Sequence, residues 1–175
     1  MSMMRYFLTA MLLFLPTTSM AIPDDMKMVG EGKAKYLGMI TVYDAALYTR
    51  EKRAPTDILS PEVSRCLKLD YAVEVSAEDF IKAADTILHR QHDKERLRRV
   101  EAEINELHRS YSKVAKGDNY TLCYDAAAKS TTLYRNRVLQ VEIVSEEFAE
   151  IYFGIWLGPQ EPLSDSLRNR LLGRE

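Results

Sequence analysis

Residues 33–49, KAKYLGMITVYDAALYT, are the longest strand-like stretch of the chain, and this stretch decides the class of fold. Apolar side chains occupy both odd and even positions, so one long strand or two joined strands should be covered on both faces. Gly38 predicts a bulge or the close approach of another backbone. Asp44 is expected at a strand break or hydrogen-bonded bend rather than in a catalytic role, because an unpaired carboxylate is unfavourable among apolar side chains.

The segments that follow alternate between strand and helix patterns. Residues 66–75, CLKLDYAVEV, predict a strand with one solvated face, and Ser76 with Asp79 is typical of a helix N-cap. Further elements are expected in this order: a helical run over 97–114, three short strands within 120–144, and helices over 146–156 and 164–172. This order, without internal repeats, predicts a single α+β domain, an antiparallel β-sheet with helices layered on it.

The helical run 97–114 carries an apolar stripe at heptad spacing, and Lys116-Gly117 is expected to close its helix. The stripe consists of Leu97, Val100, Ile104, Leu107, Tyr111 and Val114. Three heptads are enough for self-association, but such a stripe more often packs on a neighbouring helix or sheet of the same chain. We favour the second interpretation.

The N-terminus predicts export. Residues 1–21 begin with a charged region that contains Arg5, continue with a short apolar run and end in small residues, as in a secretory signal peptide cleaved near Ala21. Residues 22–175 then form the single domain, and no later segment is apolar enough to span a bilayer. We therefore expect a periplasmic or secreted protein without a transmembrane segment after cleavage.

Charge and cysteine content narrow the functional classes. The chain has 24 basic and 26 acidic residues, a balance that disfavours a nucleic-acid partner, whose phosphates require clustered Lys and Arg. Cys66 and Cys123 are the two cysteines, each within or at the start of a strand-like segment. In an exported protein they either form a disulfide or remain two small buried apolar residues.

The sequence contains no pattern that favours a catalytic or metal-binding motif. Asp85, His89 and His92 have metal-compatible spacing, but they are expected on the solvent face of their helix. Phosphate-binding loops, nucleophile elbows and Cys-x-x-Cys pairs do not occur in the sequence. We predict neither a cofactor nor a metal site.

The two ends of the chain, residues 30–49 and 153–173, resemble the chalcone isomerase-like family, in its exported bacterial branch. Members open with Gly-x-Gly and a strand ending in Val-Tyr-x-Ala-Ala-Leu-Tyr, and close with Ile-Trp-Leu-Gly, a proline and a leucine-rich helix. The matching residues are Gly30, Gly32, Val42, Tyr43, 45–48, 155–158, Pro162 and 171–173. The resemblance implies an open-faced β-sandwich, an antiparallel sheet with helices layered on one face and a ligand cleft between sheet and helices. Trp156 is expected as a core residue of that helix layer.

The resemblance implies two alternative activities. The isomerase branch closes a ring on a phenolic enone with an arginine, a threonine and a tyrosine. Here Lys33 and Lys35 are the basic candidates for the arginine, and the threonine position falls on Tyr43. Because lysine lacks the planar fork of arginine, these departures count against isomerase activity.

Another branch binds fatty acids without catalysis, with the carboxylate on the same basic residue and the tail under the helices. The candidate polar contacts are Lys33 or Lys35 with Tyr43 or Tyr48. Alternation puts Lys35 and Tyr43 on one face and Tyr48 on the other, unless a bulge at Gly38 swaps the faces.

Our leading hypothesis is an exported, non-catalytic binding domain for a small amphipathic acid, for example a fatty acid. The alternatives are a chalcone isomerase-type enzyme acting on a phenolic enone, and a structural or partner-binding envelope protein without a ligand.

Overall fold

The fold is that of a computed structural model that describes residues 21–51 and 54–174. The predicted signal peptide, 1–21, lies outside these residues except for its last member, Ala21. None of the helices in the described part of the chain has the length and hydropathy needed to cross a bilayer.

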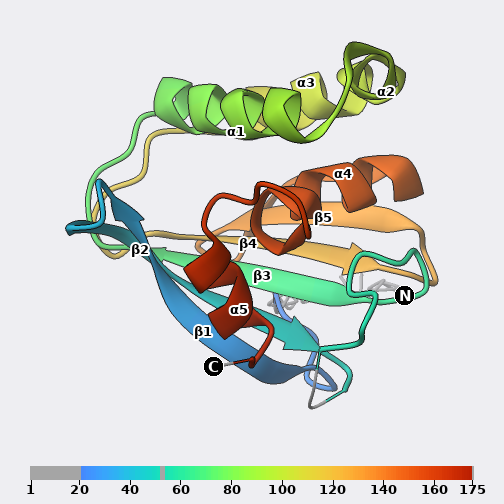
Figure 1. The fold of residues 1–175 in the computed structure, drawn as a ribbon, viewed down its shortest axis with the longest axis horizontal. Helices are drawn as coiled ribbons and strands as arrows, with labels where there is room; N and C mark the ends of the chain where they lie inside the picture. Colours follow the sequence, from blue (N-terminus) through green and yellow to red (C-terminus); the bar gives the residue numbers. More distant parts are fainter. Residues whose placement is uncertain (1–20, 52–53, 175) are drawn as a thin grey trace, which may run out of the picture.

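The described residues form one six-stranded antiparallel sheet in the order β1-β2-β3-β4-β5-β6, so each strand pairs with its neighbours in sequence (Figure 1). The strands are β1 (Lys27–Tyr36), β2 (Ile40–Thr49), β3 (Arg65–Tyr71), β4 (Asn119–Asp125), β5 (Ser130–Arg135) and β6 (Val138–Val144). The helices are α1 (Ala77–Gln91), α2 (Lys94–Arg99), α3 (Glu101–Ser110), α4 (Glu146–Leu157) and α5 (Asp165–Leu171). This is the predicted α+β class.

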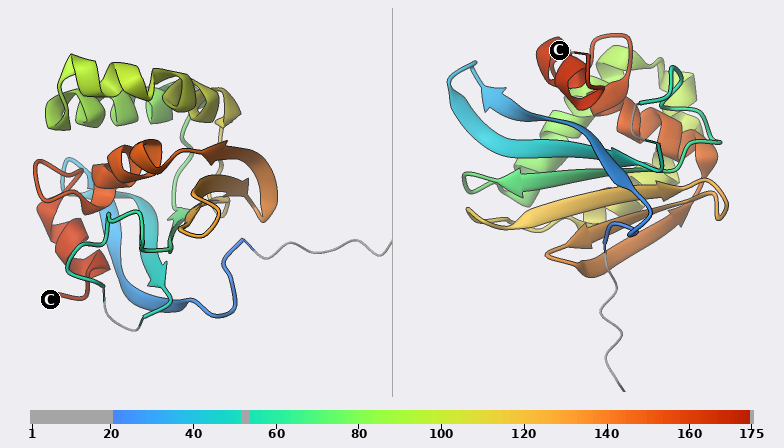
Figure 2. Two further views of the ribbon diagram at one scale, coloured as in Figure 1. Left: turned by 90° about the vertical axis from the view of Figure 1, so that its right-hand side faces the viewer. Right: turned by 90° about the horizontal axis from the view of Figure 1, so that it is seen from below.

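All of these helices lie on one face of the sheet, which confirms the layered arrangement (Figures 1 and 2). Helix α4 lies between the sheet and the layer of α1, α2 and α3. Its side chains are buried from Phe148 to Leu157 except at Glu150, as expected for a helix that is apolar all round. Ser76, Ser145 and Ser164 cap α1, α4 and α5 by accepting a backbone N–H through the side chain.

The long strand-like stretch is a β-hairpin rather than one strand. Tyr36 and Met39 close its turn, and Leu37 and Gly38 occupy the two central positions with φ of 50° and 73°. Gly38 therefore serves the turn, and the register of the β1–β2 ladder shifts elsewhere, between Met28 and Gly30 and between Ala34 and Lys35. The expected break at Asp44 is wrong, since Asp44 continues β2 and its carboxylate pairs with Lys33 across the strands.

The helical run expected over 97–114 ends earlier than predicted, at Ser110. Tyr111 is already extended, and Val114 forms an isolated bridge with Val75. The apolar stripe is nevertheless buried within the chain: Tyr111 is partly buried, and the other five members are at most 8% exposed. The apolar periodicity continues past the end of the helix because Tyr111 and Val114 are buried by contacts other than helix packing.

Directly opposed leucines form the centre of the inner sheet face, which is the face toward the helices. Leu47, Leu67, Leu122 and Leu133 follow one another across β2 to β5, and all are buried. The positions one residue away therefore point to the outer face. Cys66 and Cys123 are opposed there and form a disulfide, which decides between the two alternatives for this pair.

The two terminal motifs pack against each other through glycine. Helix α5 lies along β1 at the edge of the sheet (Figure 1). A Cβ at Gly30 would lie 2.0 Å from the carbonyl oxygen of Arg170, and one at Gly32 would lie 2.8 Å from Leu167. The Gly-x-Gly motif therefore permits the close contact of strand and helix that closes one side of the site.

Candidate functional site

An open groove of about 600 Å³ lies between the β1–β2 hairpin, the start of α1 and α5. Its polar lining comes from the hairpin, from the α5 region and from the start of α1, and it includes Lys35, Ser164, Arg170 and one carboxylate, Asp79. Its apolar lining includes Val42, Phe80 and Leu163. The groove thus combines basic and hydroxyl groups and one carboxylate with an apolar wall.

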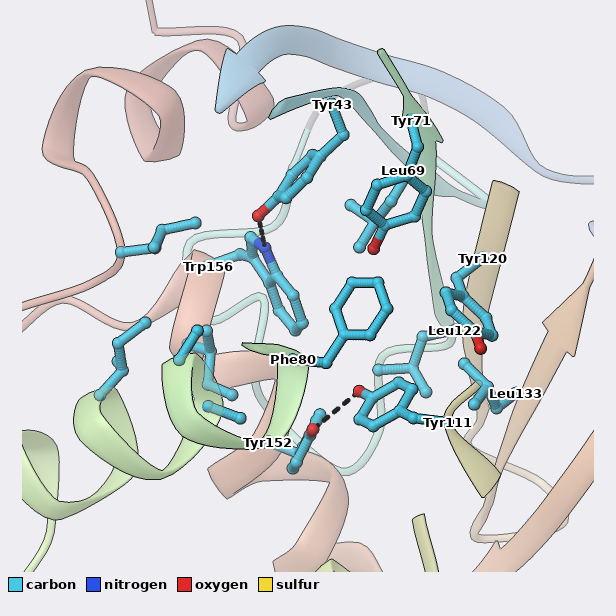
Figure 3. Close-up of a pocket in the computed structure, with 15 residues that line it drawn as sticks. Tyr43, Leu69, Tyr71, Phe80, Tyr111, Tyr120, Leu122, Leu133, Tyr152 and Trp156 are labelled. Atoms are coloured by element: carbon cyan, nitrogen blue, oxygen red, sulfur yellow. Dashed lines mark hydrogen bonds between the residues drawn. The ribbon is translucent and has the colours of Figure 1, made fainter. Parts of the chain in front are cut away.

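A smaller cavity of about 80 Å³ continues inward under the helices (Figure 3). Aromatic rings dominate its wall, and the rings of Tyr43 and Tyr71 meet edge to face with centroids 5.4 Å apart. The complete lining is Tyr43, Leu69, Tyr71, Phe80, Ala83, Ala84, Ile87, Tyr111, Tyr120, Leu122, Leu133, Tyr152, Ile155, Trp156 and Leu163. This inner cavity is apolar apart from its hydroxyl groups and the indole N–H.

Tyr43 stands where the groove meets the inner cavity, because it lines both. Its hydroxyl oxygen accepts a hydrogen bond of 2.9 Å from Nε1 of Trp156, drawn as a dashed line in Figure 3. Burial raises the pKa of Tyr43 to about 12, although the indole hydrogen bond opposes the shift. Tyr43 is therefore a neutral phenol and a poor general base, and no other residue in the described part of the chain accepts its O–H.

The other tyrosine hydroxyls of the inner cavity differ in their bonding. Tyr111 and Tyr152 share a hydrogen bond of 2.8 Å between their hydroxyls, and the hydroxyl of Tyr120 accepts from the backbone N–H of Ser112. The Tyr71 hydroxyl has no hydrogen-bond partner among residues 21–51 and 54–174 (Figure 3). Burial raises the pKa of Tyr71, Tyr111 and Tyr152, so these phenols are neutral.

The two predicted lysines occupy different settings. Lys35 lines the groove together with Tyr43, as the sequence suggested, and it has no ion pair with another described residue. Lys33 borders the same groove, but its ammonium group pairs with Asp44. Because Asp44 alternates with buried Tyr43 and Ala45, this ion pair lies on the outer face of the sheet.

Tyr48 is the predicted site residue that the fold separates from the others. It is opposed to Cys66 on the outer face, whereas its neighbour Leu47 is fully buried on the inner face. The sheet therefore lies between Tyr48 and the inner cavity.

Sequence reasoning missed Arg170 as a groove residue, and it assigned Trp156 to the core alone. Trp156 is only 9% exposed, in agreement with a core role, but it also lines the inner cavity and bonds Tyr43. As the single tryptophan within a terminal motif it offered a signal. Arg170 offered none, because nothing local indicates that α5 packs along β1.

Metal-binding geometry is not found among the described residues. The buried histidine, His108, has Nδ1 3.9 Å from a carboxylate oxygen of Asp85. Desolvation lowers the pKa of His108, so its imidazole is neutral near pH 7.

Comparison with known proteins places this geometry in context. The model of one protein family, described as chalcone isomerase-like, matches residues 15–173. Comparison with curated protein sequences gives no match. Among solved structures, a fatty-acid binding protein from Arabidopsis thaliana superposes with a TM-score of 0.66 at 14% sequence identity, over 91% of this chain and 94% of that protein. At this identity the superposition establishes a shared fold.

Proposed function

Because the chain belongs to the chalcone isomerase-like family, we propose that it is a non-catalytic binding protein for a small amphipathic acid, such as a fatty acid. The observation that carries this proposal is the polarity gradient of the site. Lys35, Arg170 and Ser164 line the open groove, and the cavity behind Tyr43 is aromatic and aliphatic. A carboxylate fits the outer part and an apolar tail fits the inner part.

The two volumes decide how such a ligand would be distributed. Small-molecule sites are typically about 300–1,000 Å³, and the groove, at about 600 Å³, falls within that range. The inner cavity, at about 80 Å³, holds only the end of a tail unless side chains move. The ligand therefore lies mainly in the groove, with its tail directed past Tyr43, Phe80 and Leu163.

Binding is favoured over isomerase chemistry by the state of the phenols. The basic residues Lys35 and Arg170 line the outer groove, and no described residue lining the inner cavity is basic, so an enone that enters the inner cavity has no cation beside it. Tyr43, with its raised pKa, donates a hydrogen bond but does not readily accept a proton from a substrate phenol. The name of the Arabidopsis thaliana structure, a fatty-acid binding protein, supports the same class of ligand.

The proposed location of this function is the periplasm or the extracellular space. Two independent features support export: the signal-peptide pattern over residues 1–21 and the Cys66–Cys123 disulfide. Disulfides of this kind persist in oxidising compartments and are rare in the cytosol.

Mass spectrometry of the periplasmically expressed protein, first native and then denatured, tests the proposal. We expect a stoichiometric acid that leaves on unfolding and whose retention falls in Lys35→Ala. Lys68→Ala is the matched control and should retain the acid, because Lys68 pairs with Asp70 on β3 and does not line the groove. An empty protein that also fails to take up added long-chain fatty acid would refute the proposal and favour the structural alternative.

A further inference from the structure

The tip of the β1–β2 hairpin exposes an apolar cluster that packs on no part of the described core. Its members are Tyr36, Leu37, Met39 and Ile40, with 62%, 74%, 80% and 54% of their surface exposed. The hairpin projects beyond the other strands at one end of the sheet (Figures 1 and 2). Four adjacent exposed apolar residues on one turn are unusual for a water-facing surface and indicate a contact with something apolar.

The backbone conformation of this turn indicates that Leu37 does not stabilise the fold. A hairpin turn with positive φ at both central residues strongly favours Asn-Gly, because asparagine tolerates the left-handed region far better than a bulky side chain does. Leu37 nevertheless occupies the first position with φ of 50°. Its side chain is 74% exposed, so no core contact offsets the strain. An external contact is the remaining physical reason for a leucine here.

The residues around the hairpin tip indicate what kind of apolar partner the tip contacts. Lys35 lies one residue before the cluster and has no described ion-pair partner, and Tyr36 has the amphipathic ring that suits a membrane–water interface. Lys35, Tyr36 and Gly38 also line the groove, so the tip is the rim of the groove. An anionic bilayer surface complements both the apolar tip and the unpaired lysine.

We propose that this hairpin tip docks onto the surface of an anionic lipid bilayer and holds the open groove against it. Leu37 and Met39 enter the interfacial region while Lys35 remains at the headgroup level. The docked groove then exchanges its amphipathic acid directly with the membrane, a step that rests on the proposed binding function. The contact is peripheral, because only a turn is buried.

Co-sedimentation with phosphatidylcholine vesicles, with and without phosphatidylglycerol, tests the docking. The central variant is Leu37→Asn, which should leave the thermal midpoint unchanged or raise it, because asparagine suits the turn. The same variant should weaken binding to the anionic vesicles by about tenfold or more, since one leucine leaves the interface. Val144→Asn is the matched control. Val144 is 73% exposed and lies at the C-terminal end of β6, away from the hairpin tip, so this substitution should not alter binding.

The outcomes separate docking from ligand binding. Wild-type binding that requires phosphatidylglycerol and is lost in Leu37→Asn alone supports the proposal. No wild-type binding, an equal loss in Val144→Asn, or equal binding to neutral vesicles overturns it. Fatty-acid uptake in vesicle-free solution is measured in parallel, and Leu37→Asn should match wild type because Leu37 does not line the groove. A protein that docks but takes up no acid refutes the binding function and leaves the docking intact.

Discussion

The hydrogen bond between Trp156 and Tyr43 gives the sharpest test of how the site is built. Tyr43→Phe keeps the ring but removes the acceptor of the indole N–H, which is 2.9 Å away and buried. A buried donor left without a partner costs about 1–3 kcal/mol. In a domain of this size 1 kcal/mol corresponds to about 2–4 °C, so the thermal midpoint should fall by about 2–12 °C.

Tyr71→Phe is the matched control. Its ring lies 5.4 Å from that of Tyr43 in the same cavity, but its hydroxyl has no hydrogen-bond partner among the described residues. Removing this hydroxyl should change the free energy of unfolding by less than about 0.5 kcal/mol, because no bond is broken. The difference between the two variants therefore isolates the indole bond from the general effect of deleting a phenol oxygen.

Equilibrium urea unfolding is the assay, and the fluorescence of Trp156 follows it because the chain has a single tryptophan. The same fluorescence reports the altered surroundings of the indole in Tyr43→Phe. Equal losses of stability in both variants, or a loss below about 0.5 kcal/mol in Tyr43→Phe, would show that the indole hydrogen bond does not stabilise the fold as proposed.

Two further predictions concern the stability of the fold. Replacing both Cys66 and Cys123 by alanine should lower the free energy of unfolding by about 4 kcal/mol, because the disulfide closes a loop between residues 57 apart in sequence. Urea unfolding measures this loss, and a wild-type unfolding midpoint that reductant leaves unchanged would contradict the prediction. Hydrogen bonds from the backbone N–H of Ala115 and from the side chains of Asn136 and Arg135 lower the pKa of Asp118 from 3.8 to about 2. The folded-state pKa is below the unfolded one, so this stabilisation is complete above about pH 4 and is lost as the pH falls toward 2. In Asp118→Asn the thermal midpoint should therefore fall less steeply than in wild type as the pH is lowered from 4 toward 2. A pH dependence identical to wild type in this range would contradict the stabilising role of the Asp118 carboxylate.

Local pattern was enough to predict most elements and their layering. The alternation over 66–75 corresponds to β3, although the strand ends at Tyr71, and the strand patterns within 120–144 correspond to β4 to β6. The predicted helices near the C-terminus match α4 and α5 to within one residue at each end. Caps and apolar periods are properties of neighbouring residues, so a sequence displays them directly. The prediction failed at the end of α3, where Tyr111 and Val114 continue the apolar spacing although the backbone is extended.

The site was only partly predictable. Sequence reasoning predicted Lys35 and Tyr43 as candidate ligand contacts, and both residues line the groove. It also kept Lys33 and Tyr48 as candidates, because the direction of each side chain depends on the hairpin turn and on pairing with β3. A ladder that shifts by one residue moves every following side chain to the other face.

Periodicities that span a few residues were enough to predict the class of fold, an antiparallel sheet with helices layered on it, and the resemblance of the two chain ends to a known family put those helices on one face. Only the tertiary structure decided that Cys66 is opposed to Cys123, that Trp156 bonds Tyr43, and that Arg170 joins the groove. Each of these contacts joins segments far apart in the chain, separated by 113 residues in the case of Trp156 and Tyr43. Strand register and the packing of α5 on β1 bring them together, and these depend on the free energy of the whole core rather than on any local pattern.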